Sequence, residues 1–186
     1  MNLFSAVWVV FGLVWLIAAL RTKQVQQRAP LGSRMAYMIP IILGSYLLFA
    51  RTPLYSPLYI RFVPRTTALE WTGLVLTGAG IAFAIWARFY IGQNWSSAVQ
   101  VKVDHELIRN GPYSLVRHPI YSGILLALVG TAFAEGRAVG FIALAFYGLG
   151  FWIKSRMEEE LMRKTFGNQY LEYSRTTGAL VPKLRF

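Results

Sequence analysis

The feature that most constrains this chain is a series of long segments with almost no charged side chains. They cover residues 3–20, 35–50, 71–90, 120–134 and 138–153. About 20 apolar residues are needed to span a bilayer as a helix. The last two segments are separated only by Glu135-Gly136-Arg137, which is short enough for a tight turn. Charged residues make up 15% of the chain, against about a quarter in soluble domains. We therefore predict an all-α, polytopic membrane helical bundle of about five transmembrane helices, in which the last two form a helical hairpin.

The basic residues are distributed unevenly between the predicted loops. Fifteen of the 19 Lys and Arg residues lie in 21–34, 88–118 and 154–186. Cytoplasmic loops accumulate such residues, so the N-terminus is expected outside and the loop and the C-terminal segment in the cytosol. The membrane would be a bacterial inner membrane or the endoplasmic reticulum, depending on the host. The same rule explains the net charge of +11 without nucleic acid, since no basic stripe is interleaved with aromatics.

The residue inventory excludes several kinds of site. The chain has no cysteine, so disulfides, thiolate nucleophiles and zinc sites with sulfur ligands are ruled out. His105 and His118 are the only histidines, and two are too few for a histidine-built metal centre. We therefore predict no metal.

The first polar cluster lies immediately before the predicted hairpin. Gly111-Pro112-Tyr113 is followed by Arg117-His118-Pro119-Ile120-Tyr121-Ser122-Gly123. A residue before proline is pushed to an extended conformation, so His118 is held off the helix and Pro119 suits its first turn. Free N–H groups at a helix start favour anions. The cluster predicts a binding site for the carboxylate of an amino-acid-like ligand. The alternative is that it only anchors the protein at the membrane interface, with basic residues near the headgroups and tyrosine at headgroup depth.

The second polar cluster, Glu158-Glu159-Glu160, follows the hairpin. On a continuing helix Glu160 would pair with Arg156, and Glu159 with Arg163, which is the pattern of a solvated charged face. The hairpin returns the chain to the same side of the membrane, so the two clusters are expected to meet although about 40 residues separate them. Together they would form a pocket with carboxylates, a histidine, aromatic rings and a helix N-terminus.

Residues 94 to 182 resemble the isoprenylcysteine carboxyl methyltransferases and the related phospholipid methyltransferases. The matching elements are Lys102-Val103-Asp104-His105-Glu106-Leu107, Gly111-Pro112-Tyr113, Arg117-His118-Pro119-Ile120-Tyr121-Ser122-Gly123, Glu158-Glu159, Phe166-Gly167-Asn168-Gln169-Tyr170-Leu171-Glu172-Tyr173 and Leu180-Val181-Pro182. Each piece is weak alone, and the ordered combination is specific. The length of the chain predicts one domain, 1–186, and its apolar segments predict three membrane helices in 1–91. The resemblance implies a cofactor-binding loop, the hairpin and a C-terminal cap in 92–186.

The resemblance also implies a cofactor, S-adenosyl-L-methionine, and a lipid-like or lipidated methyl acceptor that arrives from within the membrane lipids. The cofactor-binding residues that it implies are Lys102, His105, Leu107, Tyr113, His118, Pro119, Tyr121, Gly123, Glu158 and Glu159. The acceptor of such an enzyme is most simply a carboxylate, which is already a nucleophile. An amine, as in phospholipid N-methylation, would first lose a proton. Arg117, Arg156 or Arg175 could orient an anionic acceptor. We take Glu159, His105 and Arg156 as the catalytic candidates.

Two other functions remain open from the sequence. Sterol or enone reductases that use NADPH share a similar C-terminal helical region, although they generally carry more membrane helices ahead of it. A non-enzymatic membrane scaffold would use the charges only as anchors. For a methyltransferase we expect Glu159→Gln and His118→Ala to weaken cofactor binding without unfolding the protein, on the expectation that both side chains face water.

Overall fold

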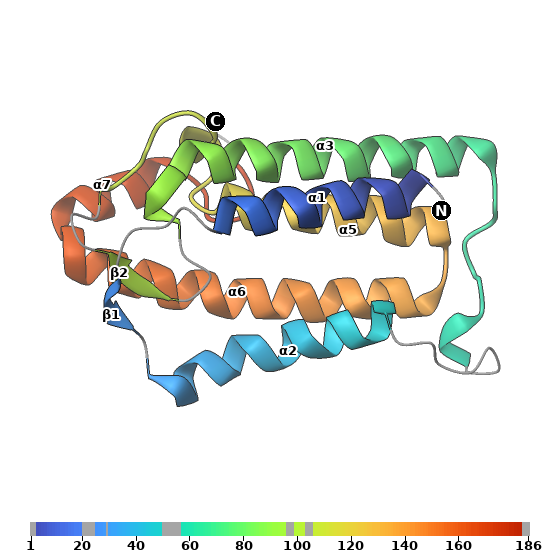
Figure 1. Ribbon diagram of the computed structural model, residues 1–186, viewed down its shortest axis with the longest axis horizontal. Coiled ribbons are helices and arrows are strands. Elements are labelled where there is room, and N and C mark those ends of the chain that lie inside the picture. Colours follow the sequence, from blue (N-terminus) through green and yellow to red (C-terminus); the bar gives the residue numbers. More distant parts are fainter. Residues whose placement is uncertain are drawn as a thin grey trace.

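The computed structural model describes residues 3–19, 25–28, 30–49, 57–95, 99–102 and 106–183. It is a bundle of roughly parallel and antiparallel helices, with a polar end built from the C-terminal elements (Figure 1). The helices are α1 (Leu3–Ala19), α2 (Leu31–Phe49), α3 (Thr67–Ile91), α4 (Pro112–Leu115), α5 (Pro119–Glu135), α6 (Ala138–Phe166) and α7 (Asn168–Thr176), with short 3-10 turns η1 (Pro57–Tyr59) and η2 (Gly92–Asn94). Strands β1 (Val25–Arg28) and β2 (Gln100–Lys102) pair antiparallel.

The predicted helical membrane bundle is confirmed, with all five apolar segments present as α1, α2, α3, α5 and α6. The spans Leu31–Leu48, Thr67–Asn94 and Ala138–Phe166 are long and apolar enough to cross a membrane, and α1 and α5 are shorter apolar helices. Helix α2 continues through Pro40. The two-stranded sheet was not predicted.

Helices α3 and α5 pack at very short range because glycines face each other across the contact. A Cβ on Gly73 would lie 2.6 Å from the carbonyl oxygen of Gly130, and one on Gly80 would lie 2.5 Å from that of Gly123. Between these two points the Thr77 hydroxyl donates to the carbonyl oxygen of Gly73 at 2.8 Å. Small residues allow backbones to approach within a membrane, where water gives little drive for helix association. The α5 segment from Gly123 to Gly130 is therefore fixed against the segment of α3 from Gly73 to Gly80.

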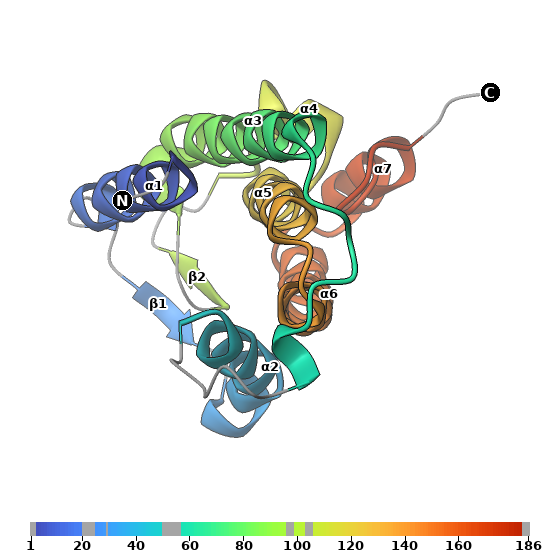
Figure 2. The same cartoon turned by 90° about the vertical axis from the view of Figure 1, so that its right-hand side faces the viewer.

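The α5–α6 hairpin has the tight turn that the sequence predicts. Gly136 ends α5 in a left-handed conformation at φ 61°, and its N–H donates to the carbonyl oxygen of Ala132 at 2.8 Å. Glycine adopts this conformation without a Cβ penalty. Seen along the bundle, α5 lies between α3 and α6, and α2 packs on the far side of α6 (Figure 2). The hairpin places the start of α5 and the last turns of α6 at the same polar end (Figure 1).

Helix α6 runs well beyond its apolar part, to Phe166, and Gly167 turns the chain into α7 with φ 53°. Two contacts then hold the C-terminal elements against the rest of the polar end. The hydroxyl of Tyr173 on α7 donates to the carbonyl oxygen of Tyr113 at 2.5 Å, and a parallel bridge joins Val116 to Gly178. The C-terminal segment thus covers the loop that leads into α5.

Candidate functional site

The loop from Val116 to His118 is held in place by the C-terminal segment. The backbone N–H of Arg117 donates to the carbonyl oxygen of Gly178 at 2.8 Å, and that of His118 donates to Ala179 at 3.0 Å. His118 is the N-cap of α5 with φ −122° and ψ 62°, and Pro119 occupies the first turn as predicted. These backbone bonds fix the direction in which the Arg117 and His118 side chains point.

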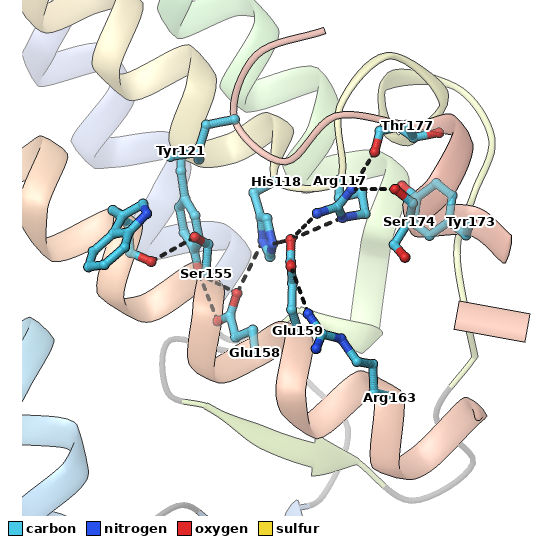
Figure 3. A network of polar contacts seen from close by, with 12 residues as sticks. Arg117, His118, Tyr121, Ser155, Glu158, Glu159, Arg163, Tyr173, Ser174 and Thr177 are labelled. Carbon is cyan, nitrogen blue, oxygen red and sulfur yellow. Dashed lines mark hydrogen bonds and ion pairs between the residues drawn. The ribbon is translucent and has the colours of Figure 1, made fainter. Parts of the chain in front are cut away.

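Arg117 forms an ion pair with Glu159 of α6, as Figure 3 shows. Its Nε donates to Glu159 Oε1 at 3.0 Å, and its guanidinium also donates to the carbonyl oxygens of Ser174, at 3.2 Å, and of Thr177. The side chains of Arg117 and Glu159 are 10% and 3% exposed. Arg163, one turn further along α6, adds a contact of 3.6 Å to the other oxygen of Glu159. Because the guanidinium donates to Glu159 on α6 and to two backbone carbonyls of the C-terminal segment, it holds α6 and this segment against the loop before α5.

The His118 ring lies between the two adjacent carboxylates (Figure 3). Its Nδ1 is 3.4 Å from Glu158 Oε2, and its Nε2 is 3.3 Å from Glu159 Oε1. Burial of the ring opposes its protonation, but hydrogen bonds and charges from Glu158 and Glu159 outweigh burial and raise the pKa of His118. Only the imidazolium has N–H donors for both carboxylates, so the geometry matches the charged ring.

Tyr121, in the first turn of α5, connects Glu158 to a stack of rings. Its hydroxyl donates to Glu158 Oε1 at 2.7 Å and Oε2 at 2.9 Å. Its ring stacks on His118 at 5.5 Å between centroids and on Phe151 of α6 at 4.7 Å. The ammonium of Lys154 lies 5.2 Å from the Tyr121 ring centroid. Glu158 is thereby held in one orientation by two neighbours on α5.

A cavity opens beside this network at the polar end of the bundle. Its lining includes charged groups, aromatic rings and aliphatic side chains from α3, α5, α6, α7 and the loop before α4. The lining residues are Ile91, Asn94, Trp95, Glu106, Leu107, Ile108, Tyr113, Arg117, His118, Pro119, Ile120, Tyr121, Glu158, Leu161, Met162, Tyr170 and Tyr173. An apolar cavity with a few convergent polar groups is the usual form of a small-molecule site.

Most of the predicted cofactor-binding residues that the structure describes meet at this cavity. Leu107, Tyr113, His118, Pro119, Tyr121 and Glu158 line it. Glu159 is not in the lining and sits behind it, with 2% of the residue exposed. Gly123 faces α3, where a Cβ would lie 2.5 Å from the Gly80 carbonyl oxygen.

The remaining predicted residues lie elsewhere or outside the described parts of the chain. His105 is outside the described residues, and Lys102 is described only as the last residue of β2. Arg156 is exposed on α6 and Arg175 is exposed on α7. Within the described ranges no group of three His, Asp or Glu side chains is placed to hold a metal ion.

Two expectations drawn from the sequence are wrong. Glu159 and His118 do not face water, because the C-terminal segment and α7 cover them and leave their side chains 3% and 9% exposed. Glu160 pairs with Lys164 at 2.7 Å, one turn later, in place of Arg156. The pair of Glu159 with Arg163 forms as predicted.

Several lining residues carry no assignment from the sequence. Asn94 and Trp95 end the turn after α3, and Tyr170 and Tyr173 project from α7. The tyrosines are three residues apart, which places them on one face of a helix and was a usable signal. An Asn-Trp pair directly after an apolar helix is a weaker signal, because it also fits an interfacial anchor.

Known proteins similar to this chain include isoprenylcysteine O-methyltransferases and a metal-resistance protein. Protein-S-isoprenylcysteine O-methyltransferase B of Arabidopsis thaliana is 31% identical over 94 residues, covering 49% of this chain and 48% of that protein. Cobalt-zinc-cadmium resistance protein CzcN of Cupriavidus metallidurans is 31% identical over 96 residues, covering 50% of this chain and 44% of that protein.

A solved structure of the eukaryotic intramembrane Ras methyltransferase, an isoprenylcysteine carboxyl methyltransferase, has the same fold over 90% of this chain and 52% of its own. The TM-score is 0.55 and the sequence identity is 23%. The chain spans about half the length of these relatives. A family model described as phospholipid methyltransferase matches residues 69–169. Because that match covers more than half of the 186 residues, the protein belongs to the phospholipid methyltransferase family, and it is an integral membrane protein.

Proposed function

We propose that this protein transfers a methyl group from S-adenosyl-L-methionine to a carboxylate on a lipid-like or lipidated acceptor, at the membrane–cytosol interface. The single observation that carries the proposal is the cavity at the polar end, where His118, Tyr121 and Glu158 converge in one hydrogen-bonded group. Family membership supports the reaction class. Several relatives are protein-S-isoprenylcysteine O-methyltransferases by name, which supports the carboxyl acceptor.

The side chains in the cavity fit the chemical parts of this methyl donor. Glu158, with 21% of its side chain exposed, offers a carboxylate to a cationic group. The N-terminus of α5 offers positive charge to a carboxylate. The faces of Tyr113, Tyr170 and other rings favour a sulfonium, because cations are attracted to aromatic faces. The cavity therefore offers negatively charged, positively charged, aromatic and apolar surfaces for the different parts of the methyl donor.

The bound cofactor supplies an electrophilic methyl group on a cationic sulfur. A carboxylate oxygen of the acceptor would take this methyl group by direct displacement, and the electron pair of the C–S bond would remain on sulfur. No proton is transferred, so the residues of this chain act by alignment and by exclusion of water. We assign contact with the ligand to Glu158 and Tyr121. Glu159 would act as a positioning residue, because it holds Arg117 and His118 from behind.

Arg117, Arg156 and Arg175 were the candidates for orienting an anionic acceptor, and their contacts distinguish them. Arg117 is engaged by Glu159 and two backbone carbonyls, so it serves to hold the site. Arg156 and Arg175 are exposed. We propose that an anionic acceptor approaches the cavity along the membrane face of the bundle. We also propose that the N-terminus lies outside and the cavity in the cytosol, as the charge bias predicts.

The family description favours one competing acceptor, the amine of a phospholipid. A transfer assay separates the two. The purified protein in lipid–detergent micelles is incubated with methyl-labelled S-adenosyl-L-methionine and membrane lipid extract or prenylated cysteine. Label that is released as methanol by alkali indicates an ester, and label that resists alkali indicates an N-methyl group. If no label is transferred and S-adenosyl-L-homocysteine does not bind, the proposed function is wrong.

A further inference from the structure

One cavity-lining residue, Asn94, has a buried polar atom that takes no part in the hydrogen bonds around His118. Asn94 ends the turn η2 after α3, is 8% exposed and lines the cavity. Its Oδ1 is buried and accepts no hydrogen bond from any described residue. Native proteins satisfy most buried acceptors, and an acceptor without a donor costs free energy. At a cavity wall, a bound water, ion or ligand can supply the donor that such an atom lacks.

The position of Asn94 is fixed by its neighbours. The N–H of Trp95 donates to the carbonyl oxygen of Gly92 at 3.3 Å, which closes the turn. The guanidinium of Arg88 lies 4.3 Å from the Trp95 ring centroid, and the Trp15 ring of α1 meets that ring edge-on at 5.4 Å. The turn that carries Asn94 is thus anchored to α1 and α3.

The part of the cavity wall around Asn94 differs in chemistry from the part around His118. Ile91, Trp95 and Ile108 pack with Tyr113 in one hydrophobic cluster. Arg117, His118 and Glu158 provide the charged part of the lining. A ligand with a charged amino-acid part and a flat, uncharged base would place the base against the apolar side chains.

We propose that Asn94 Oδ1 accepts a hydrogen bond from the exocyclic amino group of the purine base of the methyl donor, and so determines the specificity for adenine. This inference rests on the proposed function. The base is the flat, uncharged part of that ligand, and its exocyclic amine is a strong N–H donor on its edge. The ammonium of the amino-acid part is better matched by the Glu158 carboxylate. A site built around one hydrogen bond rejects an analogue that lacks the donor.

The test compares two ligands that differ at this group. Titration calorimetry measures the binding of S-adenosyl-L-homocysteine and S-inosyl-L-homocysteine, which carries an oxygen in place of the amine. We expect the wild type to prefer the adenosyl ligand by about tenfold or more, and Asn94→Leu to lose most of that preference. Asn110→Leu is the matched control, because Asn110 is exposed and outside the cavity lining, and it should behave as wild type.

Thermal unfolding without ligand gives a second readout. Removal of an unsatisfied acceptor predicts that Asn94→Leu melts no lower than the wild type, whereas a structural amide predicts a lower melting temperature. Asn94→Ala is the second variant in case leucine does not fit. Unchanged preference between the two ligands in both variants overturns the inference while leaving the proposed function intact, as does failure of both to fold. No binding of either ligand to the wild type overturns both proposals.

Discussion

Glu159→Gln tests whether the buried carboxylate holds the site together. The substitution keeps the size of the side chain and one acceptor oxygen, but it removes the negative charge shared by Arg117 and His118, which are 10% and 9% exposed. Removal of one partner from a buried ion pair costs about 3–5 kcal/mol. The hydrogen bond that glutamine can still accept recovers about 1 kcal/mol. We therefore expect a loss of about 2–4 kcal/mol in the free energy of unfolding.

The assay is unfolding in mixed micelles with increasing sodium dodecyl sulfate, followed by tryptophan fluorescence. Glu160→Gln is the control, because it is the same substitution one residue later on a side chain whose partner, Lys164, is also exposed. We expect no measurable change for the control. The deficit of Glu159→Gln should shrink as the pH rises and His118 loses its proton. Equal stability of the two variants, or a deficit independent of pH, would refute the account of the network.

Three further outcomes follow from the geometry. The pKa of His118 is raised in the folded state, so its ion pairs stabilise the fold fully at pH values below the pKa of the unfolded state. This stabilisation is lost as the pH rises through the pKa of the folded state, and the melting temperature should fall over that interval. In His118→Gln the fall in melting temperature should be smaller. Tyr121→Phe keeps the ring stack but loses the hydrogen bonds to Glu158, so S-adenosyl-L-homocysteine should bind about tenfold weaker in calorimetry, and a loss of about 1 kcal/mol of stability should lower the melting temperature by about 2–4 °C. Gly123→Val forces α3 and α5 apart and should abolish the monodisperse peak in size-exclusion chromatography, whereas Gly78→Ala, with nothing within 4 Å of its Cβ, should not.

Hydropathy was sufficient to predict all five apolar helices, because the length of an uncharged segment is visible in the chain itself. The boundaries were less predictable. Helix α2 begins at Leu31 and not at residue 35, because a polar first turn makes the same backbone hydrogen bonds as an apolar one. Helix α6 continues to Phe166 because charged residues are compatible with a helix beyond the apolar span. The three- and four-residue strands carry too few residues to show an alternating pattern.

The site was predicted as a set of residues but not as an arrangement. The hairpin argument placed the His118 cluster and the Glu158 cluster together, since both ends of a tight hairpin emerge on one side. Burial could not be read from those residues, because it depends on α7 and on the pairing of the C-terminal segment with Arg117 and His118. Asn94 was missed for a related reason: its value as an acceptor depends on the missing donor, which is a property of the folded cavity.

The adjacent pair Glu158-Glu159 shows why a motif alone does not assign roles. Successive residues on a helix point about 100° apart, so two neighbouring carboxylates have different surroundings even though both contact His118 here. Here Glu158 turns towards Tyr121 and the cavity with 21% of its side chain exposed, while Glu159 turns inward at 3%. Glu159 was a candidate for catalysis on sequence grounds, whereas we propose that it positions Arg117 and His118, both of which it contacts. Loss of Glu159 should therefore weaken binding only in proportion to the loss of structure, whereas loss of the Glu158 charge should weaken binding in a protein that still folds.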